Sequence, residues 1–147
     1  MKFTSFSRCS KVPSQNYSKL LSAIVQQPVS VAINQSPDMI SYGGGVYDGK
    51  CTSDINHGML LTGYGEDDQP YWILRNSLGT TWGISGYIHI KRLLTDGDGK
   101  CGIQLAASVP QNLKWLIKVI NQENNLIYAN LELVEINKCV VIILSNN

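Results

Sequence analysis

The sequence lacks a charge excess, a long apolar run and closely spaced cysteines. Twelve Lys and Arg residues against 11 Asp and Glu give a net charge of +1, so we expect no affinity for nucleic acid or for an anionic membrane surface. The longest strongly apolar run, Cys139–Leu144, is far shorter than the roughly 20 residues that cross a bilayer. Phe3 and Phe6 are isolated in a polar N-terminal stretch, so no signal-peptide core is predicted and the compartment stays unknown.

The cysteine pattern does not indicate a metal site. The chain has four cysteines, Cys9, Cys51, Cys101 and Cys139, and none belongs to a C-x-x-C pair. The spacing from Cys51 to His57 is not one that zinc sites use. We therefore predict no metal and no cofactor. Buried thiols and disulfides are both compatible with the spacing, and disulfides would imply maturation in an oxidising compartment.

The composition is that of one globular domain with a substantial core. The 147 residues are 44% hydrophobic and 16% charged, which excludes a disordered chain. Apolar residues recur at helical spacing from Tyr17 to Gln26, which predicts a short helix with Asn16 as its N-cap. Residues 29–33 are β-branched at alternate positions and predict a strand after Pro28.

Further strands are predicted at 57–63, 71–75 and 86–91, with a last one at 103–109. Turns of hairpin length separate the first three, which favours an antiparallel sheet or a small barrel. The stretch 96–99 lacks the ligand series of a calcium loop and is interpreted as a turn. Residues 1–15 are predicted to be irregular, and 111–147 to form an apolar tail of two or three strands. The fold class is therefore α+β, mainly antiparallel and barrel-like, with one short helix.

A series of short motifs from residue 12 to residue 110 indicates a family. They keep one order along about two-thirds of the chain: Gln27–Ile33, Gly44–Cys51, Asn56–Gly58, Gly63–Gly65, Tyr71–Ser77, Thr81–Gly83, Gly86–Ile90 and Cys101–Ile103. Together they make this region similar to the C-terminal half of papain-like cysteine peptidases, particularly the plant-type members. The resemblance implies one half of a two-part fold, in which a helical half bears the cysteine and a β-rich half bears histidine and asparagine.

The resemblance implies a role for particular residues. His57 would be the general base that activates a thiol, and Asn76 would orient its imidazole ring. Cys51 and Cys101 lie where the family has a disulfide, which would stabilise by roughly 4 kcal/mol on a chain-entropy estimate. The resemblance places Ala32, Ile55, Asn56, Gly58 and Ala106 at substrate-pocket positions. Ala32, Ile55 and Ala106 would favour an apolar or aromatic substrate residue.

Two departures from the family pattern affect the expected activity. The nucleophile motif C-G-S-C-W is absent, and counting back the usual 130–150 residues from His57 passes the start of the chain. Neither Cys9 nor Cys139 has the helix start that lowers a catalytic thiol's pKa. Leu78 replaces the tryptophan that shields the histidine–asparagine bond, and Trp82 is the remaining aromatic residue expected near the site.

These features predict a truncated half of a cysteine peptidase, inactive alone, that hydrolyses peptide bonds only with the missing half. An alternative is a non-catalytic pseudo-peptidase that binds peptides or a protein partner carrying the helical half. A partial gene product without an independent role is a third possibility. The expected partners are thus peptide or protein, and family members usually work in lysosome-like, vacuolar or extracellular settings.

Overall fold

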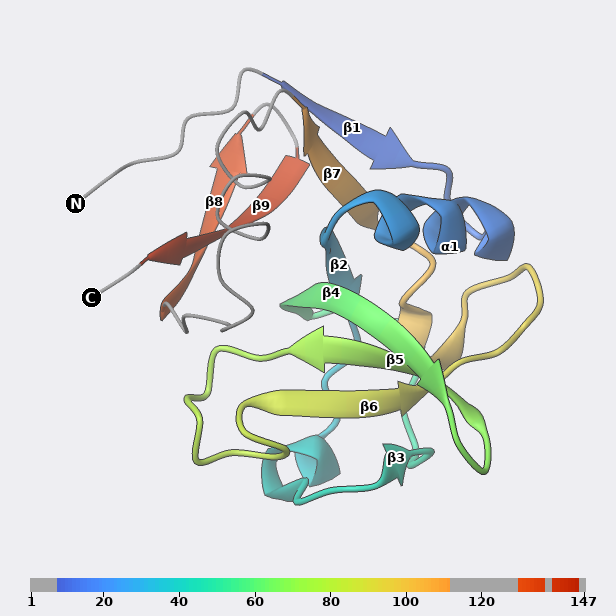
Figure 1. The fold of residues 1–147 in the computed structure, drawn as a ribbon, viewed down its shortest axis with the longest axis vertical. Coiled ribbons are helices and arrows are strands. Elements are labelled where there is room, and N and C mark those ends of the chain that lie inside the picture. The colour runs from blue at the N-terminus through green and yellow to red at the C-terminus, as the bar shows by residue number, and fades with distance from the viewer. Residues whose placement is uncertain (1–7, 112–129, 137–138, 146–147) are drawn as a thin grey trace.

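A mixed seven-stranded sheet is the centre of the fold (Figure 1). The computed structural model describes residues 8–111, 130–136 and 139–145. Within these residues the strand order of the large sheet is β1-β7-β2-β4-β5-β6-β3. Its strands are β1 (Arg8–Val12), β2 (Val29–Ile33), β3 (Val46–Tyr47), β4 (His57–Glu66), β5 (Pro70–Arg75), β6 (Tyr87–Lys91) and β7 (Ala107–Gln111).

Antiparallel pairing dominates this sheet, as predicted. Only β3 and β6 pair in parallel among the described strands. The sheet does not close into a barrel, because β1 and β3 remain its two outer strands. The structure is therefore α+β with an open sheet and one α-helix in the described residues.

The helix α1 (Tyr17–Gln26) forms where the sequence predicts it. The Asn16 side chain accepts a hydrogen bond from the Lys19 backbone N–H at 2.9 Å, which satisfies one donor of the first turn. Leu20 and Ile24 are buried against the sheet. Backbone φ and ψ turn extended at Gln27 and end the helix just before Pro28.

Alternating side chains of the central strands build the core. Inward-facing residues of β2, β4, β5 and β6 are 0–2% exposed: Val29, Val31, Ile33, Met59, Leu61, Trp72, Leu74, Ile88 and Ile90. A period of two residues is expected when one sheet face packs on a core. This core holds the ends of β4 and β5 in a fixed relation.

The prediction of an irregular segment over residues 1–15 is wrong for Arg8–Val12. These residues form β1, which pairs antiparallel with β7. None of the β1 residues is fully buried. Its sequence therefore does not need the alternation of apolar and polar residues that would mark a strand. Pairing with β7 makes it a strand, and such long-range pairing is invisible in a local pattern.

The predicted strand at 103–109 is also only partly present. The chain first makes the 3-10 helix η2 (Lys100–Gly102) and a turn in which the Leu105 N–H donates to the Gly102 carbonyl. Strand β7 then begins at Ala107. The apolar residues Ile103 and Ala107 are both buried, and burial rather than strand geometry explains the apolar run.

The C-terminal region contains a second, two-stranded sheet. Strands β8 (Asn130–Ile136) and β9 (Cys139–Ser145) pair antiparallel in the described part of the tail. The apolar run at 113–120, one candidate for a further strand, lies outside the described residues.

Candidate active site

The sheet brings His57 and Asn76 to the same edge. Strands β4 and β5 are antiparallel, with Leu60 opposite Arg75. His57 begins β4 and Asn76 follows the last residue of β5. The start of one antiparallel strand lies beside the end of its neighbour, so 19 residues of separation close into direct contact.

The two side chains share a hydrogen bond. His57 Nε2 lies 2.9 Å from Asn76 Oδ1. The Ser77 backbone N–H donates to the same oxygen at 2.8 Å. Because a backbone N–H only donates, the Asn76 atom facing both groups is the oxygen. His57 Nε2 therefore carries the hydrogen, and Nδ1 is left as the basic nitrogen of the neutral ring.

Asn76 is held rigidly and is only 3% exposed. Its backbone N–H donates to the Gly86 carbonyl at 2.9 Å. Its Nδ2 group is buried without a hydrogen-bond partner in the described residues. Leu78, predicted to shield the bond, is 46% exposed, so much of this side chain faces solvent.

Three of the predicted pocket residues lie next to one another. Ala32 of β2 is the cross-strand partner of Gly58 in β4, one residue beyond His57. The Ala32 N–H donates to the Ala106 carbonyl at 2.9 Å. The pairing of β2 with β4 and the bond to Ala106 thus bring Ala32, Gly58 and Ala106 together.

Ile55 and Asn56 lie on the loop that leads into β4. Ile55 is 40% exposed. A Cβ on Gly102, whose φ is +76°, would lie 3.0 Å from Ile55 Cγ2, so a larger residue there would push Ile55 aside. The Asn56 side chain accepts from the Gln35 N–H at 2.8 Å. This bond ties the residue before His57 to the end of β2.

A disulfide anchors the same loop. Cys51 and Cys101 are bonded, with their Cα atoms 5.1 Å apart, as the resemblance implied. The Asn34 side chain adds two bonds, accepting from the Thr52 N–H at 3.1 Å and donating to the Asp54 carbonyl at 2.8 Å. The loop is therefore fixed at several points before it reaches His57.

The model of the papain family cysteine proteases matches residues 1–111. The chain belongs to the papain family of cysteine proteases. Among curated relatives, a KDEL-tailed cysteine endopeptidase of Arabidopsis thaliana is 46% identical over 104 residues, which are 69% of this chain and 29% of that protein. Vignain of Vigna mungo is 45% identical over 102 residues, covering 67% and 28%. The chain thus spans less than a third of the length of these relatives.

Solved papain-family structures have the same fold over this region. A bromelain protease from Ananas comosus, in complex with the E64 inhibitor, superposes with a TM-score of 0.68 at 34% identity. The match covers 71% of this chain and 50% of that one. Procathepsin L 3 of the Tenebrio molitor larval midgut gives a TM-score of 0.63 at 43% identity, covering 72% and 35%. The described sheet is therefore a partial papain-family domain.

Trp82 lies on the loop that follows Asn76 and joins β5 to β6. Its indole N–H donates to the Ile40 carbonyl at 2.9 Å, and its ring centroid lies 5.7 Å from that of Tyr42. Trp82 thus attaches the loop after β5 to the 3-10 helix η1 (Pro37–Ser41).

His89, the second histidine of the chain, is partly buried on β6. Its ring stacks on Tyr71 with a centroid distance of 4.4 Å and an interplanar angle of 12°. Burial lowers the pKa of His89, and the Asp67 carboxylate opposes that shift. His89 sits on β6, whereas His57 begins β4, so we assign it no role in the site.

Sequence reasoning missed two polar residues that support the site loop. Asn34 follows a buried strand. A single asparagine at this place in the sequence does not indicate which groups its side chain will bond to. Asp98 accepts from Ser53 at 2.6 Å and from Gln15 at 2.7 Å. These hydrogen bonds, Ser53 first, lower the pKa of Asp98. They connect three segments far apart in the sequence.

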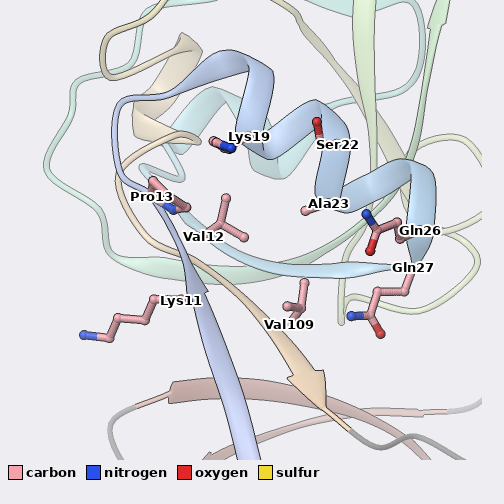
Figure 2. Close-up of a pocket in the computed structure, with 9 residues that line it drawn as sticks. All are labelled: Lys11, Val12, Pro13, Lys19, Ser22, Ala23, Gln26, Gln27 and Val109. Atoms are coloured by element: carbon pink, nitrogen blue, oxygen red, sulfur yellow. The ribbon is translucent and has the colours of Figure 1, made fainter.

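A hollow of about 300 Å³ lies between β1 and α1 (Figure 2). Its lining contains no predicted site residue: Lys11, Val12, Pro13, Lys19, Ser22, Ala23, Gln26, Gln27 and Val109. Across the described ranges, no group of three His, Cys, Asp or Glu side chains is placed to bind a metal ion. No helix in that part of the chain is long and apolar enough to cross a membrane.

Proposed function

We propose that His57 and Asn76 are the base and the orienting residue of a peptidase site whose nucleophilic cysteine is not among these 147 residues. The observation that carries the proposal is the 2.9 Å contact between His57 Nε2 and Asn76 Oδ1. The Ser77 N–H donates to the same Asn76 atom, which independently identifies that atom as the oxygen. It makes Nδ1 of His57 the atom that can accept a proton. Peptide bonds are the proposed substrate, as for the papain family.

The proposed chemistry follows from that tautomer. Nδ1 of His57 takes the proton of a thiol placed beside it, and the resulting thiolate attacks the peptide carbonyl. The imidazolium returns the proton to the leaving amine, and water then hydrolyses the acyl-enzyme. Asn76 keeps the ring in position through both steps because its oxygen accepts from Nε2.

The functional unit we propose is the half-domain 12–110, since the family match ends at residue 111. Residues 111–147 lie outside it. Ala32, Ile55, Asn56, Gly58 and Ala106 are proposed to form its substrate-pocket wall, with an apolar preference. Leu78 and Trp82 are proposed to border the histidine–asparagine pair.

The test is reconstitution. The purified chain alone is expected to give no turnover of fluorogenic peptides under reducing conditions, because no activated thiol is present. Mixing it with the helical half of a relative such as bromelain should restore turnover that a thiol alkylator abolishes. His57→Ala should remove this activity, and Asn76→Ala should lower kcat roughly tenfold, the equivalent of one hydrogen bond of about 1.4 kcal/mol.

The two halves of the bromelain chain, mixed with each other, serve as the matched control. Thiol-dependent turnover by the chain alone would contradict the proposal that the nucleophile lies elsewhere. Reconstituted activity that His57→Ala leaves unchanged would contradict the assignment of the base.

A second candidate function is binding without catalysis. Ile55, on the loop that leads into His57, is 40% exposed, and the proposed pocket positions Ala32 and Ala106 carry small apolar side chains. We propose that together they form an apolar surface next to His57. Such surfaces often bind peptides or protein partners. A complex with the helical half, seen by size-exclusion chromatography but without turnover, would favour this candidate. Turnover in that complex would favour the peptidase.

A further inference from the structure

The sequence contains the N-glycan acceptor pattern Asn-x-Ser twice. One copy is Asn16-Tyr17-Ser18, at the start of α1, and the other is Asn34-Gln35-Ser36, just after β2. The pattern is frequent by chance, so it is informative only together with the surroundings of each asparagine. The two copies differ in which amide atoms of the asparagine the fold already uses.

At Asn16 the fold uses only the amide oxygen. Oδ1 accepts from the Lys19 N–H at 2.9 Å and lies 3.0 Å from the Ser18 hydroxyl, which donates to it. The described residues provide no hydrogen bond to Nδ2, and this atom is not buried. A glycan joined to Nδ2 keeps the amide carbonyl, so the helix cap survives the modification. Ser18 is exposed as well.

At Asn34 the fold uses both amide atoms. Oδ1 accepts from the Thr52 N–H, and Nδ2 donates to the Asp54 carbonyl at 2.8 Å. The hydroxyl of Ser36 is also occupied, since it contacts Asp38 and Tyr47, and Ser36 is 8% exposed. A glycan on Asn34 would break the bonds that hold the loop before His57.

The cysteines supply an independent observation about the compartment. Cys51 and Cys101 are bonded, and Cys9 is also disulfide-bonded. Disulfides form and persist in oxidising compartments such as the lumen of the endoplasmic reticulum. N-glycosylation belongs to the same secreted context, because its Asn-x-Ser acceptors are surface sites of secreted proteins.

We propose that Asn16 is an N-glycosylation site of this protein and that Asn34 is not. The co-substrate is a polyprenyl diphosphate-linked oligosaccharide. The anomeric carbon of its first sugar forms a bond to Asn16 Nδ2 and breaks its bond to the diphosphate oxygen. Nδ2 loses one proton to a base, and the polyprenyl diphosphate leaves. This assignment concerns the N-terminal end of α1 and does not depend on the peptidase proposal.

The test uses the full 147-residue chain behind a cleavable secretion leader, translated in the presence of endoplasmic-reticulum microsomes. The expected result is one step of slower gel mobility that peptide N-glycosidase reverses. The enzyme converts the modified asparagine to aspartate, and peptide mass spectrometry should locate that aspartate at position 16. The mobility step is read on the chain recovered with Cys51 and Cys101 bonded, because Asn16 and Asn34 differ only in the folded chain.

Three variants separate the explanations. Asn16→Asp keeps an oxygen for the helix cap and should lose the mobility step completely. Ser18→Ala should lose it too, whereas Ser18→Thr, which keeps a hydroxyl, should retain it. Asn34→Gln should retain the full step. A wild-type chain that is translocated without any glycan would overturn the proposal, and so would a glycan found on Asn34.

Discussion

Replacing Arg92 is expected to lower the free energy of unfolding, because its buried charge connects α1 to the sheet. Its side chain is 7% exposed. Nη1 donates to the Tyr17 hydroxyl at 2.8 Å. The guanidinium carbon lies 4.9 Å from the centroid of Tyr64 and 5.5 Å from that of Trp72. The substitution Arg92→Met removes the charge and the donors while keeping much of the apolar stem.

The expected loss follows from these contacts. A hydrogen bond from a charged group contributes about 1.5–3 kcal/mol, and each partly desolvated cation–π contact about 0.5–2 kcal/mol. The Glu66 ion pair, 3.5 Å long with Glu66 65% exposed, adds about 0–1 kcal/mol at most. Against these gains, Nε is buried without a described partner, which costs about 1–3 kcal/mol. We expect Arg92→Met to lower the free energy of unfolding by about 2–3 kcal/mol.

Urea unfolding followed by tryptophan fluorescence measures this loss. With a slope of about 1–3 kcal/mol per molar urea, the midpoint should fall by roughly 1–2 M. Tyr17→Phe is the matched partner variant and should lose about 1.5 kcal/mol, the lower end of the range for this charged hydrogen bond. The double variant should lose less than the sum of the two single losses, because both remove the same bond. A loss below about 0.5 kcal/mol, or strict additivity with Tyr17→Phe, would refute the reasoning.

Three further predictions concern the site and its surroundings. Replacing Cys51 and Cys101 with serine should lower the free energy of unfolding by about 4 kcal/mol in urea titrations, because the bond closes a separation of 50 residues; a loss under about 1 kcal/mol would contradict the entropic account. Because burial lowers the pKa of His89 below its ordinary 6.5, the unfolded chain binds that proton more readily, so stability should fall as the pH drops below about 6.5. The variant His89→Phe should show a flatter dependence, and an equal slope would argue against this cause. Finally, long-range ¹H–¹⁵N NMR should show that the neutral His57 ring carries its proton on Nε2. Asn76→Ala should weaken that tautomer preference roughly fivefold, the equivalent of a bond of about 1 kcal/mol. A wild-type ring protonated on Nδ1 would exclude the assigned geometry.

The contact between His57 and Asn76 shows how much of the structure the local sequence predicts. The motifs around His57 and Asn76 place each residue beside an apolar strand-forming run. Two strands joined by a short turn bring their outer ends together. The contact between residues 57 and 76 is therefore predictable from a hairpin alone, and the 2.9 Å bond agrees with it.

The support for the loop before His57 was not predictable in the same way. Asn34, Asp98 and Gln15 are polar residues outside the strands. Each is hydrogen-bonded to a residue at least 18 positions away in the sequence. Many donors and acceptors compete for such residues, and only the folded arrangement selects one. His89 shows the same limit, since its neighbour Tyr71 comes from another strand.

Short-range sequence patterns predict the family, the helix at Tyr17–Gln26 and the pairing of β4 with β5. They can do so because apolar spacing and turns act over a few residues. The outer strand β1 and the partners of Asn34 and Asp98 are determined only once distant segments meet. Their physical cause is hydrogen bonding across long sequence separations, which a local sequence pattern does not specify.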